Sequence, residues 1–475
     1  MRSWRAAATA TTLGAALGLT ACGALEARYR QPPLPVANAW PIAPSVSDGS
    51  AADIGWRDFL VDPRLQQLVA LALDNNRDLR VAVLTVEKAR ATYRIARAAE
   101  LPAVNASGSL TREREPGFLL GSPTAVTLSY YSAGVGVSNF EVDLFGRVAS
   151  LRHAALEQYL AEEEARRAAQ LTLIAEVANA YLTRAADAER LRLAQATLDS
   201  QQASFRITDQ QHALGAVSAL DLSQARTTVE AARADVARYS GAVAQDDNAL
   251  TLLVGRPIDA ALLPPAFTPE VSGLKPLPAG LPATVLLRRP DVLEAEHALR
   301  SANANIGAAR AAFFPSITLT GNVGGVSSAS TGLSKLFESS ASTWSFVPQV
   351  TIPIFQGGAL RAGLSAATAD RDVALARYEQ AIQTSFREVA DALALTTALA
   401  QQREAQQAQA EATATAYQLS EQRYRAGRDS YLVLLDSQRS DYAAQQSLIT
   451  TRLAEQANRV TLYKALGGGW RETVN

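Results

Sequence analysis

The sequence has little of the residues on which catalytic and metal sites usually depend. Its 475 residues include one cysteine, one methionine and three histidines, His153, His212 and His297. A single cysteine excludes an internal disulfide, and no histidine has a second ligand at metal-binding spacing. There is neither a phosphate-binding glycine loop with its lysine nor a nucleophile elbow. We therefore expect a protein that is not an enzyme, with no metal and no dissociable cofactor.

An excess of charge of one sign is also missing. The chain has 45 basic and 46 acidic residues, a formal net charge of −1. Proteins that bind nucleic acids usually present a basic surface, so we expect no nucleic-acid partner. Asp246 and Asp247 are adjacent on a predicted helix, and we interpret them as part of a solvated face. Beyond the first residues, no apolar run reaches the 18 residues that a transmembrane helix needs.

The single cysteine lies in an informative place. Arg2 and Arg5 precede an apolar run at 6–19, and small residues lead from there to Cys22. This order is typical of a secretory signal peptide, which we place at 1–21. Cleavage before Cys22 resembles a bacterial lipoprotein site, so we expect a covalent lipid on this thiol as the anchor. An ordinary signal peptide with an incidental cysteine is the alternative.

The chain contains a long internal repeat. At an offset of 213 residues, Asp78, Pro102 and Gly108 recur as Asp291, Pro315 and Gly321. At an offset of 212, Gly215, Ser218 and Leu220 recur as Gly427, Ser430 and Leu432. A period this long indicates a duplicated structural half rather than an array of small units.

The repeat gives the expected organisation of the chain. Each half has the same order of helix, β-hairpin, very long helix, turn and shorter helix. We divide the sequence into a signal peptide (1–21), a lipidated N-terminal linker (22–61), a first repeat (62–255), a proline-rich connector (256–283), a second repeat (284–467) and a C-terminal tail (468–475). We expect the connector to be a surface segment.

Each half contains a predicted hairpin, at about 103–145 and 316–355. Apolar residues alternate with polar or small ones in both, at Tyr131, Ala133, Val135 and Val137, and at Trp344, Phe346, Val350, Ile352 and Ile354. A period of two suits strands with one lipid face and one wet face. The charged stretch from Arg112 to Gly117 predicts a turn. Two soluble hairpins are the alternative.

Helices of unusual length follow the hairpins, within 147–253 and 357–466. A helix of about 65 residues is roughly 100 Å long, which exceeds a bilayer and indicates a coiled-coil column. Gly215 and Gly427 interrupt the two stretches and predict chain reversals at positive φ. A cytoskeletal-type rod is the alternative, although an export leader and two hairpins argue against it.

Several stretches together resemble one family, the bacterial outer-membrane efflux lipoproteins of tripartite pumps, of the TolC/NodT type. The resemblance extends from Cys22 to about Trp470. It is carried by Glu141 to Arg147, Arg289 to Val292, Ala311 to Pro315, Pro353 to Gly358, and Tyr424 to Arg439.

The resemblance implies a mixed, mainly α fold. In a homotrimer, four strands from each protomer would build a twelve-stranded barrel in outer-membrane lipid. The long helices would form a periplasmic coiled-coil barrel. The implied function is a passive exit duct, which takes solutes from a periplasmic adaptor and an inner-membrane RND-type transporter. A protein-secretion duct and a non-conducting structural envelope lipoprotein remain as alternatives.

The resemblance also implies site residues. The two helical turns would contact the adaptor, through Gly215, Ser218, Leu220, Gly427 and Ser430. The periplasmic gate would consist of Leu432, Asp436 and Arg439, which share one helix face by their spacing. Three copies would give a leucine ring that can dewet the passage and a carboxylate ring that attracts cations. A solvated salt bridge is the alternative for Asp436, and its first-half counterpart is Gln224. The solute stays open among drugs, dyes, aromatic compounds and metal ions.

Overall fold

The computed structural model describes residues 25–26, 28–41, 54–119, 121, 123–268, 271, 273–275, 283–328, 330 and 332–468. The expected signal peptide and Cys22 lie outside the described residues, as does nearly all of the expected tail.

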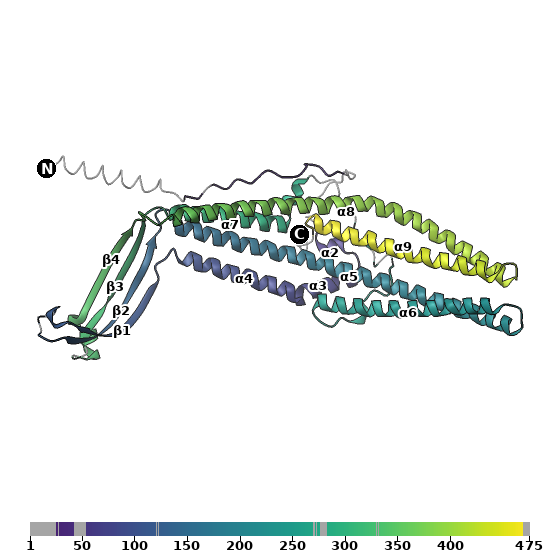
Figure 1. Cartoon of the computed structure of the whole chain (residues 1–475), viewed down its shortest axis with the longest axis horizontal. Coiled ribbons are helices and arrows are strands. Elements are labelled where there is room, and N and C mark those ends of the chain that lie inside the picture. Colours follow the sequence, from purple (N-terminus) through teal and green to yellow (C-terminus); the bar gives the residue numbers. More distant parts are fainter. Residues whose placement is uncertain are drawn as a thin grey trace. The chain divides into compact units, whose positions relative to one another are not determined.

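The described chain consists of helices, one four-stranded sheet and short 3₁₀ turns (Figure 1). The helices are α2 (Trp56–Phe59), α3 (Pro63–Asn75), α4 (Arg77–Ala98), α5 (Arg147–Ala213), α6 (Ala219–Val254), α7 (Pro290–Ala311), α8 (Ala359–Arg425) and α9 (Tyr431–Ala465). The strands are β1 (Val104–Glu115), β2 (Val126–Val142), β3 (Ser316–Ser328) and β4 (Ser342–Thr351). The 3₁₀ turns are Gly117–Leu119, Ala260–Leu262, Ala283–Arg288, Leu333–Phe337 and Ser339–Ala341.

The two halves contain matching elements. Helices α4 and α7 have 22 residues each, and α5 and α8 have 67 residues each. The returning helices α6 and α9 have 36 and 35 residues. The order of elements therefore repeats along the chain, as the sequence offset of 212 to 213 residues requires.

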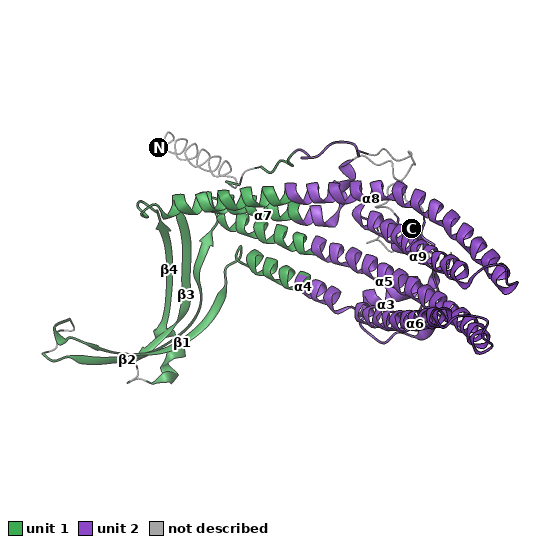
Figure 2. Ribbon diagram, turned by 45° about the vertical axis from the view of Figure 1, so that its right-hand side comes forward, with its two compact units in different colours: residues 1–32, 86–162, 295–378 green, residues 33–85, 163–294, 379–475 purple. Residues whose placement is uncertain are grey.

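The chain divides into two compact units, and each unit draws on both repeats (Figure 2). Unit 1 comprises Met1–Pro32, Val86–Glu162 and Ala295–Tyr378. Unit 2 comprises Pro33–Thr85, Glu163–Glu294 and Glu379–Asn475. The compact units therefore cut across the sequence repeats, because the long helices carry each half through both units.

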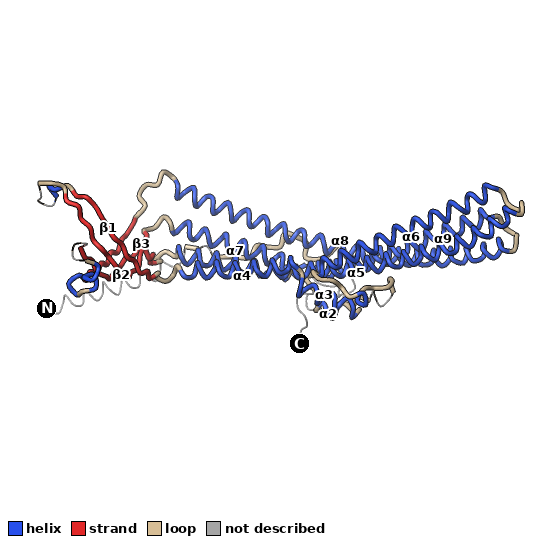
Figure 3. Tube along the Cα trace, turned by 90° about the horizontal axis from the view of Figure 1, so that it is seen from below, coloured by secondary structure: helices blue, strands red, loops and turns tan. Residues whose placement is uncertain are grey.

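The sheet lies in unit 1, and its strands are antiparallel in the order β1-β2-β3-β4 (red in Figure 3). Its register sorts the side chains onto two faces, since alternate residues of a strand point to opposite sides. One face carries the rows Val104-Val137-Gly321-Phe346 and Ala106-Val135-Val323-Trp344. The other carries the rows Asn105-Gly136-Asn322-Ser345 and Ser107-Gly134-Gly324-Thr343. The sheet thus has an apolar face and a polar face.

A bulge in β2 keeps its apolar residues on one face. Val137 pairs with Gly321, and Phe140 pairs with Leu319, so three steps along β2 match two along β3. The extra residue is accommodated at Asn139, which has φ 53° and is the one non-glycine residue with positive φ among those described. The bulge shifts the alternation of the strand by one residue.

The predicted turn at Arg112 to Gly117 is wrong for most of its length. Strand β1 continues to Glu115, which pairs with Val126, and the turn begins after it. Cross-strand partners explain the difference, because Tyr130 donates from its hydroxyl to Glu113 at 3.3 Å. Charged residues are compatible with a strand wherever a neighbouring strand pairs with its backbone N–H and C=O groups.

Three helices of unit 1 lie in a row. The rings of Tyr93 on α4 and Tyr159 on α5 stack with centroids 6.4 Å apart. On another side of α5, Ser301 of α7 donates to the carbonyl oxygen of Ala154 at 2.9 Å. Helix α5 therefore separates α4 from α7 (Figure 2).

The main apolar core lies in unit 2 and surrounds α2 and α3. Asp62 caps α3 through the backbone amide of Arg64 and also accepts a hydrogen bond of 2.7 Å from Tyr181. The core includes Phe267, Val271 and Leu274 of the proline-rich connector. The expectation of a mere surface segment is therefore wrong, because the connector places apolar side chains against α3 and α5.

The repeat also fixes how each half ends. Asn76, just before α4, donates from its amide to the carbonyl oxygen of Leu253 at 2.8 Å. At the matching position before α7, the guanidinium of Arg289 donates to the carbonyl oxygen of Ala465 at 2.6 Å. Gly255 and Gly467 follow with φ of 76° and 74°. The C-terminal end of α6 is thus hydrogen-bonded to the residue before α4, and the C-terminal end of α9 to the residue before α7.

Candidate functional site

The predicted tip consists of two helical turns that share one backbone geometry. In the first turn, the amide of Gly215 donates to the carbonyl of His212 at 2.9 Å, and that of Ala216 to Gln211 at 2.8 Å. In the second turn, Gly427 donates to Tyr424 and Arg428 to Arg423, both at 2.9 Å. Both glycines have positive φ, 72° and 68°. This paired pattern closes a helix end with glycine in the left-handed region.

The two turns differ in how the next helix begins. Ser218 accepts from the backbone amide of Asp221, and the Asp221 carboxylate accepts from the Ser218 amide, which forms a capping box. Ser430 has no such side-chain bond. The second turn is instead braced by Arg423, which donates twice to Asp429 at 2.7 and 2.8 Å.

The surface of both turns is apolar in places. Leu214 and Leu220 flank the first turn and are 84% and 65% exposed, and Leu432 follows the second turn at 62%. Gly215, Ser218, Gly427 and Ser430 are exposed as well. The predicted adaptor-contact residues are therefore all accessible in the single chain, and their contact role stays a prediction.

A small apolar cluster supports the tip from below. It joins Ala225 of α6 with Tyr431, Leu434 and Leu435 of α9. Leu432 and Asp436 lie on the opposite, exposed face of α9. The structure therefore brings these two predicted gate residues onto one face, as their spacing of four residues requires.

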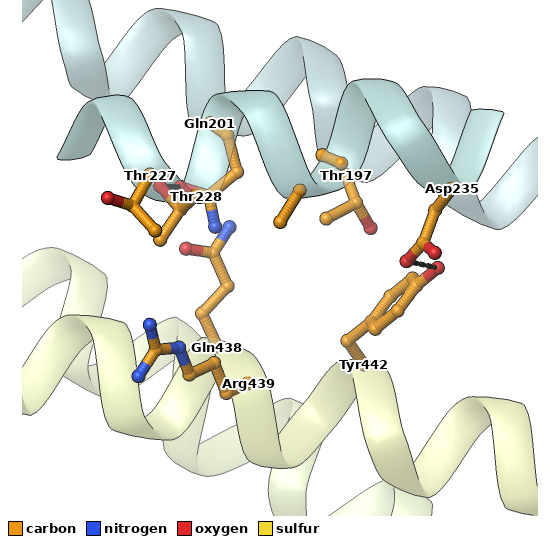
Figure 4. Close-up of a pocket in the computed structure, with 10 residues that line it drawn as sticks. Thr197, Gln201, Thr227, Thr228, Asp235, Gln438, Arg439 and Tyr442 are labelled. Atoms are coloured by element: carbon orange, nitrogen blue, oxygen red, sulfur yellow. Dashed lines mark hydrogen bonds between the residues drawn. The ribbon is translucent and has the colours of Figure 1, made fainter. Parts of the chain in front are cut away.

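Arg439, the third predicted gate residue, is exposed on α9 as well and also borders a partly open cavity. It belongs to the lining of a cavity of about 130 Å³ between α5, α6 and α9, whereas Leu432 and Asp436 do not (Figure 4). Most of the labelled lining is polar, with Thr197 and Gln201 from α5, Thr227, Thr228 and Asp235 from α6, and Gln438, Arg439 and Tyr442 from α9. A gate role for the three residues stays a prediction.

Polar contacts connect the helix pairs around this cavity. Tyr442 of α9 donates from its hydroxyl to Oδ2 of Asp235 on α6 at 2.9 Å (Figure 4). Burial and this carboxylate raise the pKa of Tyr442 above its usual value. Farther along, Tyr239 of α6 donates to Gln446 of α9 at 3.0 Å. No pattern in the sequence predicts these pairs, because they depend on the alignment of helices 207 residues apart.

A carboxyl pair joins α5 and α6. Asp246 lies beside Asp187, and burial together with this neighbour raises the pKa of Asp246 to about 6. Asp247 forms an ion pair with Arg184 at 3.0 Å. The interpretation of Asp246 as part of a solvated face is therefore wrong, since the helix turns its side chain toward α5.

The histidines lie in two places, one at the first turn and two beside the Glu157 carboxylate. His212 contacts the carbonyl oxygen of Val217 in the first turn at 3.1 Å. His153 and His297 contact carboxylates in unit 1. Among the described residues, no group of three or more His, Cys, Asp or Glu side chains could hold a metal ion. Over the same residues, no helix has the length and apolar character needed to cross a bilayer.

Known proteins share both the sequence and the fold. The profile of the family described as outer membrane efflux protein matches residues 68–256 and 281–468. A toluene efflux pump outer membrane protein, TtgC of Pseudomonas putida, is 48% identical over 449 residues, which cover 94% of this chain and 92% of the relative. The outer membrane protein OprJ of Pseudomonas aeruginosa is 44% identical over 460 residues, covering 96% and 95%.

A solved structure has a similar fold. The open state of the MtrE outer membrane channel of Neisseria gonorrhoeae superposes with a TM-score of 0.85 at 39% identity. The match covers 94% of this chain and 99% of that channel. The similarity therefore includes the sheet, the long helices and the turns between them.

Proposed function

Because this chain belongs to the outer membrane efflux protein family and is an outer-membrane efflux channel, we propose that it is the passive exit duct of a tripartite pump. Three copies would form the duct, and a periplasmic adaptor and an inner-membrane RND-type transporter would deliver the solute. The observation that supports this most directly is the sheet. It has an apolar and a polar face, and its outer strands β1 and β4 have no further partner within the described chain.

An open sheet edge must find a partner in lipid. Unpaired backbone groups are costly in hydrocarbon, and a closed barrel leaves no edge. The apolar face would contact lipid and the polar face would line the passage. Four strands are too few to close a barrel by themselves, since even small barrels have about eight. Copies of the same chain supply the missing strands most simply.

The repeat indicates how the copies would meet. Within one chain, α7 packs on α5 through Ser301 and Ala154. The repeat relates α7 to α4 and α5 to α8, so the equivalent contact joins α4 of one copy to α8 of the next. Helix α4 exposes a matching stripe, with Val81, Leu84, Lys88, Ala91 and Ile95 on one face.

This arrangement is testable by cross-linking. The contact between His297 and Glu157 maps onto Leu84 and Ala369, both of which are exposed in the single chain. We expect Leu84→Cys with Ala369→Cys to form covalent dimers and trimers on oxidation, because a disulfide needs closely spaced Cα atoms. Arg371→Cys, half a turn around α8, is the matched control. Equal cross-linking of both pairs would contradict the proposed packing.

The duct would also have a lipid anchor, a docking site for the adaptor and a gate. Cys22 would carry the lipid anchor. The exposed turns around Gly215 and Gly427 would dock the adaptor, because they present the same backbone twice with apolar side chains beside it. Leu432, Asp436 and Arg439 would line the gate where the three copies converge.

The cargo would include apolar organic solutes. This rests on the relative named as part of a toluene efflux pump, and on the expectation that a duct selects little by itself. Growth of a deletion strain against antibiotics, dyes, solvents and metal ions tests it. Sensitivity to several unrelated amphiphiles, restored by the wild-type gene, is the expected result, and sensitivity to metal ions alone would contradict it.

Conduction itself is testable in a planar lipid bilayer. The purified protein should pass current, and Asp436→Ala should alter it. A trimer that passes no current, even with Asp436→Ala, would overturn the proposed duct. No observation of the structure favours protein secretion or a purely structural role.

A further inference from the structure

Two arginines near the end of β1 lie on the apolar face of the sheet. Arg112 and Arg114 are separated from Ala106 by even numbers of residues, and alternate residues of a strand point to the same side. Their cross-strand neighbours on β2 are Ser129 and Thr127, which are neutral. Both arginines are exposed. The apolar face therefore ends in a positively charged patch, formed by Arg112 and Arg114, which we call the arginine pair.

The carboxylates next to the arginine pair in the sequence point to the other side. Glu113 and Glu115 lie on the polar face, where Glu113 accepts the hydrogen bond from the hydroxyl of Tyr130 at 3.3 Å. The strand thus separates an alternating charge pattern into a positive side and a negative side. In the proposed duct, the positive side faces the lipid and the negative side faces the passage.

The arginine pair lies beyond the four-stranded part of the sheet. Among the described residues, the pairing of β2 with β3 ends at Tyr130 and Ser328, so residues 112–115 belong to a two-stranded extension of the hairpin (Figure 2). Two strands with open edges are unsuited to hydrocarbon, because their outer backbone groups need polar partners. Since β1 begins after α4 and β2 ends before α5, the extension is the end of the sheet farthest from these helices.

The apolar face changes character next to the arginine pair. On this face, the adjoining row is Leu110-Tyr131-Ser327, in which Leu110 is 59% exposed. Tyrosines of membrane barrels gather in girdles at the level of the lipid headgroups. The order along the face is apolar rows, then Tyr131, then two cations. This is the order of hydrocarbon, interface and charged headgroups in one leaflet of a membrane.

A groove continues along the same face toward the helices. It has a volume of about 480 Å³, and its lining includes Ala106, Ala133, Val135, Leu336 and Phe337. Ala133 is four residues along β2 from Ser129, the neighbour of Arg112, which corresponds to about 14 Å. An acyl chain whose headgroup lies at the arginine pair is long enough to enter this groove.

We propose that the arginine pair binds the phosphate groups of an outer-leaflet lipid, with an acyl chain of that lipid in the groove. Guanidinium groups match phosphate oxygens in geometry and charge, and form strong two-pronged hydrogen bonds with them. The tyrosine and the groove favour a lipid over free phosphate, because a free anion uses neither. The inference rests on the proposed barrel, in which the apolar face meets lipid. Each copy of the chain provides one such site.

Binding of lipid A to the full-length protein in detergent tests the site. Lipid A is the probe because it is acylated and carries phosphate groups, and native mass spectrometry measures its affinity. We expect Arg112→Gln with Arg114→Gln to weaken binding by at least about tenfold. Arg206→Gln with Arg226→Gln, which removes two exposed arginines of α5 and α6, is the charge-matched control. Equal affinity of the two double variants would overturn the proposal.

A second variant tests the separation of charge between the two faces. Exchange of the four charges leaves the composition and net charge unchanged, and consists of Arg112→Glu, Glu113→Arg, Arg114→Glu and Glu115→Arg. It moves the cations to the polar face, so lipid A should bind as weakly as to the neutral variant. Wild-type affinity would refute the proposed site.

Two measurements on the wild-type protein need no variant. Lipid A from which the phosphate groups have been removed should bind at least about tenfold more weakly than intact lipid A, and equal binding would contradict the role of phosphate. Inorganic phosphate should displace lipid A no better than sodium chloride of equal ionic strength. Specific displacement by inorganic phosphate would assign the arginine pair to a free anion instead of a lipid.

Conductance of the same preparations separates this inference from the proposed duct. Variants that conduct as wild type and keep wild-type affinity for lipid A would overturn the lipid site and leave the duct intact. A wild-type protein that passes no current would count against the duct, whatever its affinity for lipid A.

Discussion

Val137 and Phe140 point to the same face of the sheet, although they are three positions apart along β2. Residues three apart in a regular strand point to opposite faces. The bulge at Asn139 accounts for the difference, and the Asn139 amide donates to Oγ1 of Thr320 at 3.2 Å. Without the bulge, the part of β2 either before or after Asn139 would turn its apolar residues to the polar face.

Insertion of one alanine after Asn139 should therefore reduce outer-membrane assembly by at least about tenfold, because a one-residue slip exchanges the faces of a strand. Heat-modifiable trimer in outer-membrane fractions is the measurement. Asn139→Gly keeps the bulge and tolerates positive φ, so it should assemble as wild type. Normal assembly of the insertion variant would show that the alternation of β2 is dispensable.

The two turns should respond differently to loss of their serines. Ser218→Ala removes a capping box and should destabilise the start of α6 by about 1 kcal/mol. Ser430→Ala removes no capping bond and should have little effect. Hydrogen exchange of the first turns of α6 and α9 measures both. The prediction fails if the two variants lose equal protection.

Tyr442→Phe should lower the melting temperature, because it leaves the Asp235 carboxylate without its phenolic donor. Hydrogen bonds to charged groups contribute about 1.5–3 kcal/mol, against about 1 kcal/mol for neutral pairs. Tyr417→Phe, which loses a neutral hydrogen bond with the Ser200 hydroxyl at 3.0 Å, is the control and should have the smaller effect. The reverse order would mean that the Tyr442 contact is weak in solution.

Asp246 should make the stability depend on pH. Its pKa is raised to about 6 in the folded chain, so between about pH 4 and pH 6 the folded chain retains a proton that the unfolded chain releases. Its favourable contribution is present below this window and is lost as the pH rises through it. Asp246→Asn cannot ionise, so it should melt at a higher temperature than wild type. The difference between the two melting temperatures should grow up to about pH 7 and stay constant above that.

Asp247→Asn is the matched control for this effect. It removes the ion pair with Arg184 and should lower the melting temperature at neutral pH. If Asp246→Asn shows no advantage at pH 8, the carboxyl pair is not formed in solution.

Asp436→Asn should reduce the preference of the channel for cations, because it neutralises the proposed carboxylate ring. Permeability ratios in salt gradients across a planar bilayer measure this preference. Gln224→Ala, at the matching position of the first half, should leave the ratio unchanged. An unaltered ratio in Asp436→Asn would place Asp436 away from the ion path.

The sequence was sufficient to predict local structure and its repetition. Pro102 and Pro315 end the first long helix of each half, and Gly215 and Gly427 reverse the chain, because these residue types restrict the backbone wherever they occur. The strands followed from their alternation, although the charged end of β1 was mistaken for a turn. Recognition of the family then supplied the function.

Contacts between distant elements could not be predicted. The pair of Tyr442 and Asp235 spans 207 residues, and that of His153 and Glu26 spans 127. Such pairs depend on how two helices are aligned, which a periodic pattern leaves open. The gate is a further case, since Leu432 and Asp436 share a face whose purpose depends on copies beyond the single chain.

The open edges of β1 and β4 have a genetic consequence. In the proposed trimer, no copy completes a barrel by itself, so one defective copy disrupts the whole channel. A defective allele expressed beside an intact one would then remove more channels than its share of the gene product. Alleles that damage the sheet would therefore be dominant over the wild-type gene.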